Sequence, residues 1–107
     1  MIETVYQFTR ESSERLIERI IDDRNVAINH MILPKGSALP PHPANSNVYM
    51  IIVRGTMSIT LIDQETQEHS AGEIINIPFL TQMDVRNNHE EVLEFFVVKA
   101  PNPRDMM

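Results

Sequence analysis

The histidines are the side chains of this sequence with the most versatile chemistry. The chain has four of them and no cysteine. A neutral imidazole can ligate a metal ion, and one with a pKa near neutrality can act as a general base. The absence of cysteine excludes disulfides, thiolate zinc sites, iron–sulfur clusters and cysteine nucleophiles. His69 and His89 lie in polar stretches that we expect in solvent, which leaves His30 and His42 as candidates.

Two further residues decide whether His42 has partners for a metal site. His30 shares one face of a predicted strand with Ile28 and Ile32, and it approaches His42 if that face points inward. The alternative, which we favour, is a core histidine hydrogen-bonded to a carbonyl. Asn47 is a third possible ligand only if a β-bulge redirects it, because a regular strand would point its side chain outward.

Methionine supplies a second candidate chemistry. Thioether sulfur together with imidazole suits Cu(I). Methionine also fills irregular gaps in hydrophobic cores, and we favour that interpretation because the sequence contains no short methionine-rich motif. The residues that we expect on an inner surface are Met31, Met50, Met57 and Met83.

A metal-free enzyme would need a positioned partner for His42. Ser46 is close to His42 in sequence, but no acidic residue nearby could orient the imidazole, and there is no Gly-x-Ser-x-Gly motif. Paired catalytic carboxylates are not evident, so whether the chain is an enzyme stays open.

The elements that must position these residues are short strands. Segments rich in Val, Ile, Thr, Phe and Tyr alternate with breaks at proline and glycine, which predicts an all-β sandwich or barrel. Alternation predicts inward faces at Met57 and Ile59, Met83 and Val85, and Phe95. The predicted strands are Val26–Leu33, Val48–Val53, Met57–Ile62, Ile74–Ile77, Gln82–Arg86 and Val92–Val98.

Two N-terminal segments carry weaker signals. Leu16 to Ile21 has helical spacing of its apolar residues, yet it ends in two aspartates, which are unfavourable at a helix C-terminus. A hairpin turn at positions 22–25 fits better, and we therefore expect a strand there. Thr4–Phe8 is also predicted to be a strand, with Val5 on one face and Tyr6 on the other.

The overall composition is that of one small globular domain. The chain has 107 residues and a formal net charge of −6. This charge disfavours nucleic acid as a partner, and no apolar run approaches the roughly 20 residues of a membrane helix. The N-terminus does not resemble a secretory signal, so we expect a cytoplasmic protein.

Two groups of turn residues resemble the motifs of the cupin superfamily. Gly36, His42 and Gly55 fall at the intervals of the first motif, about 36–55. Gly72 and Asn87, with Pro78 between them, fall at those of the second, about 72–87. The resemblance implies a single domain over residues 1–107, with the jelly-roll type double-stranded β-helix fold.

The resemblance also implies where a metal would bind, and the ligands are mostly missing. Cupins usually hold a divalent ion with three histidines and one glutamate, of which only His42 is present. The other ligand positions hold Ala44, Val48 and Met83, and Leu80 replaces the glycine of the second motif. One imidazole cannot hold such an ion alone, so we expect no cofactor and no bound metal. If a metal is present, its ligands are His42, His30 and Asn47.

We therefore expect a barrel pocket that binds a small apolar or weakly polar molecule without the usual metal. The alternatives are a metal-dependent dioxygenase or isomerase with a rebuilt site around His42, and a structural or regulatory dimer. We also expect a homodimer, because Val48–Val53 is apolar on both faces and only one can line the barrel. The expected pocket residues are His42, Val48, Met50, Met83, Phe95 and His30.

Overall fold

The computed structural model describes residues 2–106, which form β-strands and one short 3-10 helix. The strands alternate with short turns in most of the chain, as the proline and glycine breaks predict. The elements are β1 Leu16–Asp22, β2 Ala27–Leu33, β3 His42–Pro43, β4 Val48–Arg54, β5 Thr56–Leu61, β6 Gln67–Ser70, β7 Ile74–Ile77, β8 Gln82–Arg86, β9 Leu93–Lys99 and η1 Pro103–Met106.

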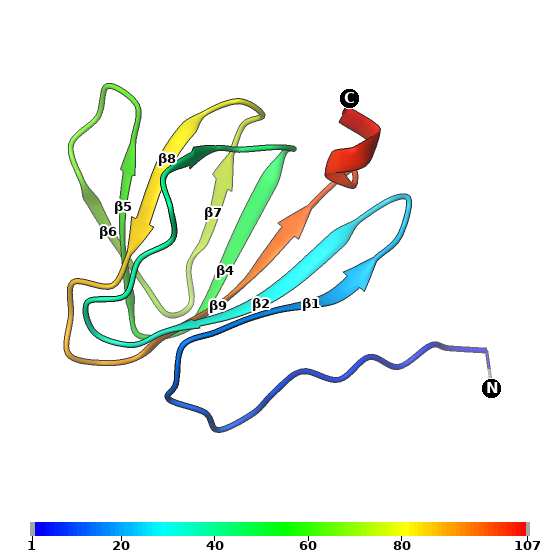
Figure 1. The fold of residues 1–107 in the computed structure, drawn as a ribbon, viewed down its shortest axis with the longest axis horizontal. Coiled ribbons are helices and arrows are strands. Elements are labelled where there is room, and N and C mark those ends of the chain that lie inside the picture. The colour runs from blue at the N-terminus through cyan, green and yellow to red at the C-terminus, as the bar shows by residue number, and fades with distance from the viewer. Residues whose placement is uncertain (1, 107) are drawn as a thin grey trace.

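The strands form two antiparallel sheets that face each other (Figure 1). One sheet has the order β1-β2-β9-β4-β7, and the other has the order β3-β8-β5-β6. The chain crosses repeatedly between them, so neighbours in each sheet come from distant parts of the sequence. This arrangement confirms the predicted all-β fold.

The core lies between the two sheets and follows the predicted alternation. Met57 and Ile59 on β5, Met83 and Val85 on β8, and Phe95 on β9 are all buried and belong to one hydrophobic cluster. Alternating side chains of the same strands point away from this cluster, because successive residues of a strand face opposite sides. The interior of the barrel is therefore filled by side chains.

Gly55 closes the β4–β5 hairpin at a point of very close backbone approach. Its φ is +81°, which favours glycine. A Cβ atom there would lie 2.3 Å from the carbonyl oxygen of Val92. Any side chain at Gly55 would thus push away the backbone of Val92, just before β9. This explains why glycine occupies this position of the motif.

The strand predictions hold except at the N-terminus and for two short strands. Leu16 to Ile21 is a strand, as expected, and it pairs with β2. The prediction of a strand at Thr4–Phe8 is wrong, because this segment pairs with no sheet edge and packs by side chains instead. Strands β3 and β6 were not predicted, since a Pro-rich pair and the polar run Gln67–Ser70 carry no apolar alternation.

Candidate functional site

His42 lies at the edge of the barrel, beside one of the replaced ligand positions. It is half-buried and pairs with Met83 in the β3–β8 ladder. Its Nδ1–H donates to the carbonyl oxygen of Pro40 at 2.8 Å, and this contact sets the tautomer. The Nε2 atom is then the only nitrogen of His42 that could bind a ligand.

The other ligand positions of the cupin motifs cannot complete a metal site. Ala44 and Val48 are fully buried and have no donor atom, and Met83 packs in the core with 3% of its surface exposed. Across residues 2–106, no three His, Cys, Asp or Glu side chains stand together in a way that could hold a metal ion. The residues present do not fit the metal that the fold family implies.

The expected pocket deep in the barrel is closed. Val48, Met50 and Phe95 are each at most 1% exposed and belong to the hydrophobic cluster. None of these three side chains lines any of the four cavities found in the structure. The cavity that touches a replaced ligand position, Ala44, lies above this layer instead.

The cavity beside Ala44 is apolar, has a volume of about 380 Å³ and lies at the mouth of the barrel. Ala44, which stands at a replaced ligand position, forms part of its wall, and the C-terminal η1 closes it from the side. Figure 1 shows η1 at the same end of the barrel as the β1–β2 turn. The side chains that give the cavity its apolar character are those of Pro43, Ala44, Phe79, Leu80, Pro103 and Met106.

Leu80 is held in an unusual conformation on the wall of this cavity. Its φ is +72°, in the left-handed region that favours glycine, and 64% of its surface is exposed. Its amide donates to the carbonyl of Ala44 at 2.8 Å, and the Ala44 amide donates to the carbonyl of Thr81 at 2.8 Å. The chain therefore keeps the backbone turn of a motif glycine while it presents a large apolar side chain beside the cavity.

The C-terminal wall is anchored by one buried amide. Asn102, 4% exposed, donates to Asp22 at 2.6 Å and to the carbonyl of Asp23 at 2.9 Å. Its Oδ1 accepts a hydrogen bond from the Arg104 amide. These bonds fix η1 to the β1–β2 turn and so set the shape of the cavity.

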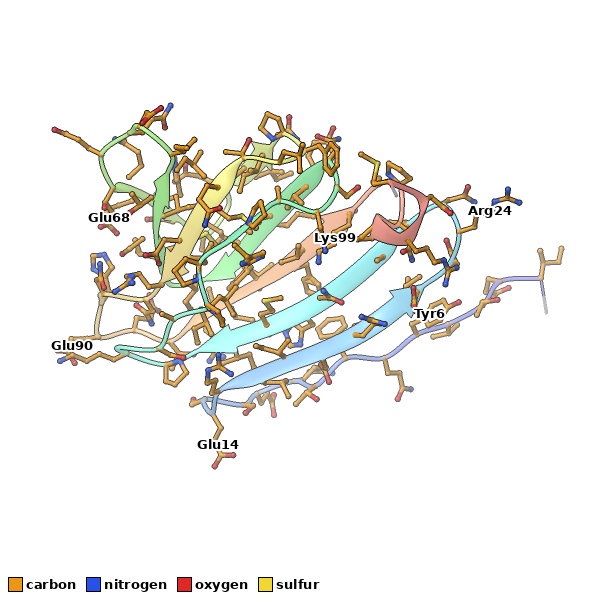
Figure 2. The ribbon with its side chains drawn as sticks, turned by 45° about the horizontal axis from the view of Figure 1, so that its top comes forward. Tyr6, Glu14, Arg24, Glu68, Glu90 and Lys99 are labelled. Atoms are coloured by element: carbon orange, nitrogen blue, oxygen red, sulfur yellow. The ribbon has the colours of Figure 1, made fainter. Side chains whose placement is uncertain are left out.

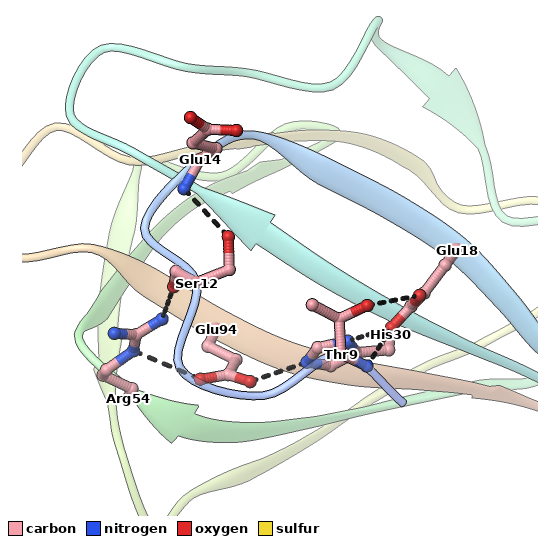
Figure 3. Close-up of polar contacts among 7 residues, drawn as sticks. All are labelled: Thr9, Ser12, Glu14, Glu18, His30, Arg54 and Glu94. Atoms are coloured by element: carbon pink, nitrogen blue, oxygen red, sulfur yellow. Dashed lines mark hydrogen bonds and ion pairs between the residues drawn. The ribbon is translucent and has the colours of Figure 1, made fainter. Parts of the chain in front are cut away.

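The structure places His30 on the outer face of its sheet, away from His42. Met31 and Leu33 are the residues of β2 that point into the core, so the expectation that His30 lines the barrel pocket is wrong. His30 is fully buried between two carboxylates rather than against a carbonyl (Figure 3). Its Nδ1 lies 2.8 Å from Glu18, and its Nε2 lies 2.6 Å from Glu94.

The N-terminal segment covers this outer histidine. The Phe8 ring lies 5.0 Å from the His30 ring and 4.8 Å from the Phe96 ring. The Thr9 amide donates to Glu18 at 2.8 Å. Beyond them, Arg54 forms an ion pair with Glu94 at 3.2 Å and donates to the carbonyl of Ser12 at 2.6 Å (Figure 3).

The remaining candidates have structural partners. The Asn47 side chain accepts a hydrogen bond from Asn76 at 2.9 Å, and the buried Ser46 hydroxyl donates to the carbonyl of Pro101. His69 and His89 lie toward solvent and each contacts a glutamate. The structure thus does not bring His42, His30 and Asn47 together. Nor does it bury Tyr49, which lies on the outer face of β4.

Sequence reasoning missed most of the cavity wall. Phe79 and Met106 come from a loop and from the C-terminal turn, neither of which has a periodic pattern. The one available signal was Leu80, because a leucine at the place of a motif glycine is a large apolar side chain in a turn.

Comparison with known proteins identifies the fold and one similar relative. No protein-family model matches the chain. MJ0764 of Methanocaldococcus jannaschii, an uncharacterized protein, is 42% identical over 106 residues, which are 99% of this chain and 91% of that protein. Its crystal structure, described as an RmlC-like cupin family protein with a double-stranded β-helix fold, covers 99% of this chain and 97% of that chain with a TM-score of 0.96.

A more distant structure agrees on the fold alone. A cupin superfamily protein of Desulfitobacterium hafniense has a TM-score of 0.74 at 11% identity, covering 87% of this chain and 83% of its own. Within residues 2–106, no helix is long and apolar enough to cross a membrane. Because the M. jannaschii protein is so similar over almost the whole length, the chain belongs to the cupin superfamily and has its RmlC-like double-stranded β-helix fold.

Proposed function

We propose that this cupin binds a small, largely apolar molecule at the mouth of its barrel, without the metal usual in its family. The observation that supports the proposal is the apolar cavity of about 380 Å³ beside Ala44. Its volume lies within the range of known small-molecule sites.

The strained Leu80 supports the same proposal. A left-handed conformation costs a residue with a Cβ roughly 1–2 kcal/mol. Backbone strain of this kind is common at binding sites, where the surroundings hold a residue against its preference. An exposed leucine in that conformation is explained if its side chain contacts a ligand.

The metal-dependent alternative has less support. It requires ligands beside His42, and the nearest replaced positions carry aliphatic or thioether side chains that pack in the core. A metal-free enzyme would need a second acid–base group near Nε2 of His42, and no observation favours one. Binding is therefore the function we propose.

A titration with 1-octanol, followed by the amide shifts in NMR spectra, tests the proposal. We expect saturable shifts at residues around the cavity, such as Asn45 and Thr81. Leu80→Asn should weaken binding about tenfold, because it removes apolar contact area. Asparagine tolerates a positive φ, so this variant keeps the turn. Ile62→Asn, which changes an exposed residue of the β5–β6 turn, is the matched control.

Failure of 1-octanol to shift the cavity resonances would contradict the proposal. So would equal affinity in the wild type and in Leu80→Asn, because the ligand would then lie elsewhere.

A further inference from the structure

A second cavity lies next to the apolar one, also beside η1. It has a volume of about 250 Å³. The two cavities share three lining residues, Asn45, Pro103 and Arg104. The two cavities therefore adjoin at Asn45 and at the start of η1.

The second cavity is positively charged in an acidic protein. Arg19, Lys99 and Arg104 line it, against one acidic residue, Asp22. Asp22 is already engaged, since it lies 3.2 Å from Arg19 and 3.7 Å from Arg104. The chain as a whole carries a formal charge of −6, so this concentration of cations is local.

Lys99 is the cation of this group that lacks an anionic partner. No ion pair joins it to any acidic group within residues 2–106. It is half-buried at the end of β9, where β2 and β4 flank it in register at Ala27 and Val48. Burial, together with the positive charge of Arg19, lowers the pKa of the Lys99 ammonium below its usual 10.5. An anion placed here would relieve both effects.

A buried polar atom in the same cavity also lacks a partner. The Oδ1 atom of Asn29 is shielded from solvent and accepts no hydrogen bond from the described residues. Asn29 pairs with Arg19 across the β1–β2 ladder and lines the cavity beside Lys99. Buried polar groups are normally satisfied, and this oxygen can only accept, so a donor such as a bridging water completes it rather than the anion itself.

We propose that the ligand is an amphipathic carboxylate, with its anionic head between Lys99, Arg19 and Arg104 and its hydrocarbon part in the apolar cavity. The inference rests on the proposed function, whose apolar site it extends by a charged subsite. Arginine side chains offer paired donors that match a carboxylate, and Lys99 adds an uncompensated charge.

The test compares two probes that differ only in the head group, octanoate and 1-octanol, by NMR titration of the full chain at neutral pH. We expect octanoate to bind about tenfold more tightly, although the net charge of the protein repels it. In Lys99→Met the ratio of the two affinities should fall toward one. Arg104→Met is a second variant with the same expectation.

The chain supplies a matched control. Lys35, the other lysine, pairs with Glu90. Lys99 pairs with Ala27 at the start of β2, whereas Lys35 follows the end of β2. Figure 2 shows Glu90, the partner of Lys35, well away from Lys99. Lys35→Met makes the same change in charge and should leave the ratio unchanged.

Each outcome separates the two proposals. Failure of both probes to bind would overturn the proposed function together with this inference. Equal binding of the two probes would overturn the charged subsite and leave the apolar site standing. A preference for octanoate that survives in Lys99→Met and Arg104→Met would also overturn it, because the head group would then lie elsewhere.

Discussion

Leu80 is held in a conformation that opposes stability, which fits our proposal that its side chain contacts a ligand. Its φ of +72° costs a leucine more than a glycine. We expect Leu80→Gly to raise the free energy of unfolding in urea by about 1 kcal/mol, while it weakens binding of 1-octanol. Thr81→Gly, at the next residue, is the control and should destabilise. Lower stability in Leu80→Gly would show that the leucine makes contacts worth more than the strain.

His30 is held by charge on both sides, and its role is structural. His30→Phe keeps a ring of similar size but leaves Glu18 and Glu94 without their shared partner. We expect the free energy of unfolding to fall by about 2 kcal/mol, because two partly buried carboxylates lose the hydrogen-bond partner that they share. The solvent-facing pair of His69 with Glu73 gives the control, and His69→Phe should change stability by less than about 0.5 kcal/mol. Equal effects of the two variants would contradict this account.

Leu80 and His30 also show how much of the site can be predicted from patterns in the sequence. Alternation along a strand identifies which residues share a face with His30, but not which face points inward. Which face points inward depends on the N-terminal segment. This segment covers the outer face with an apolar contact from Phe8 and a polar contact from Thr9. Leu80 was recognisable as a departure from a motif. Its position beside a cavity was not predictable, because η1 forms the other wall of that cavity.

At the scale of elements, the N-terminal segment is fastened partly by an ionised carboxylate. Burial raises the pKa of Glu18, but hydrogen bonds from Thr9 and His30 outweigh this effect and hold the pKa below the usual 4.5. A carboxylate with a lowered folded pKa stabilises the structure above its unfolded pKa, and the stabilisation is lost as the pH falls through the folded pKa. We therefore expect the Thr9 amide resonance to titrate with a midpoint below pH 4.5 and the segment to loosen there.

The control for this titration is Glu18→Gln. It removes the titrating group while it keeps an oxygen that can accept a hydrogen bond from Thr9, so the acid transition of the Thr9 amide should vanish. A transition that persists in Glu18→Gln, or a wild-type midpoint above pH 4.5, would assign the fastening of the segment to other contacts.

The strands with apolar alternation were predictable, and the ones without it were not. Short strands such as Gln82–Arg86 have residues whose inward and outward faces differ in polarity, which is sufficient to locate them. The pair at His42–Pro43 forms a strand only because β8 lies beside it. Thr4–Phe8 has a strand-like composition but pairs with no sheet edge. Phe8 instead packs against His30 of β2 and Phe96 of β9, and the next residue, Thr9, donates to Glu18 of β1.

At the scale of the whole molecule, one part of the outer surface remains uncovered and apolar. The N-terminal segment covers the outer face at β2 and β9, and η1 lies at the barrel mouth. Neither covers Tyr49 and Val53 on β4, or Ile74 on the edge strand β7. These residues are 38%, 49% and 65% exposed, and Ile51 and Ile74 are cross-strand partners within the same patch.

We propose that a second copy of the chain covers this patch in a two-fold dimer. Such dimers are the commonest oligomers, and a two-fold axis lets the same apolar surface meet itself. Light scattering at micromolar concentration should give the mass of two chains. A lysine at Ile74 would place like charges at the contact, so Ile74→Lys should give the mass of one chain. Ile62→Lys, at an exposed isoleucine of the other sheet, should remain a dimer. A wild-type mass of one chain that persists at high concentration would mean that the patch faces solvent.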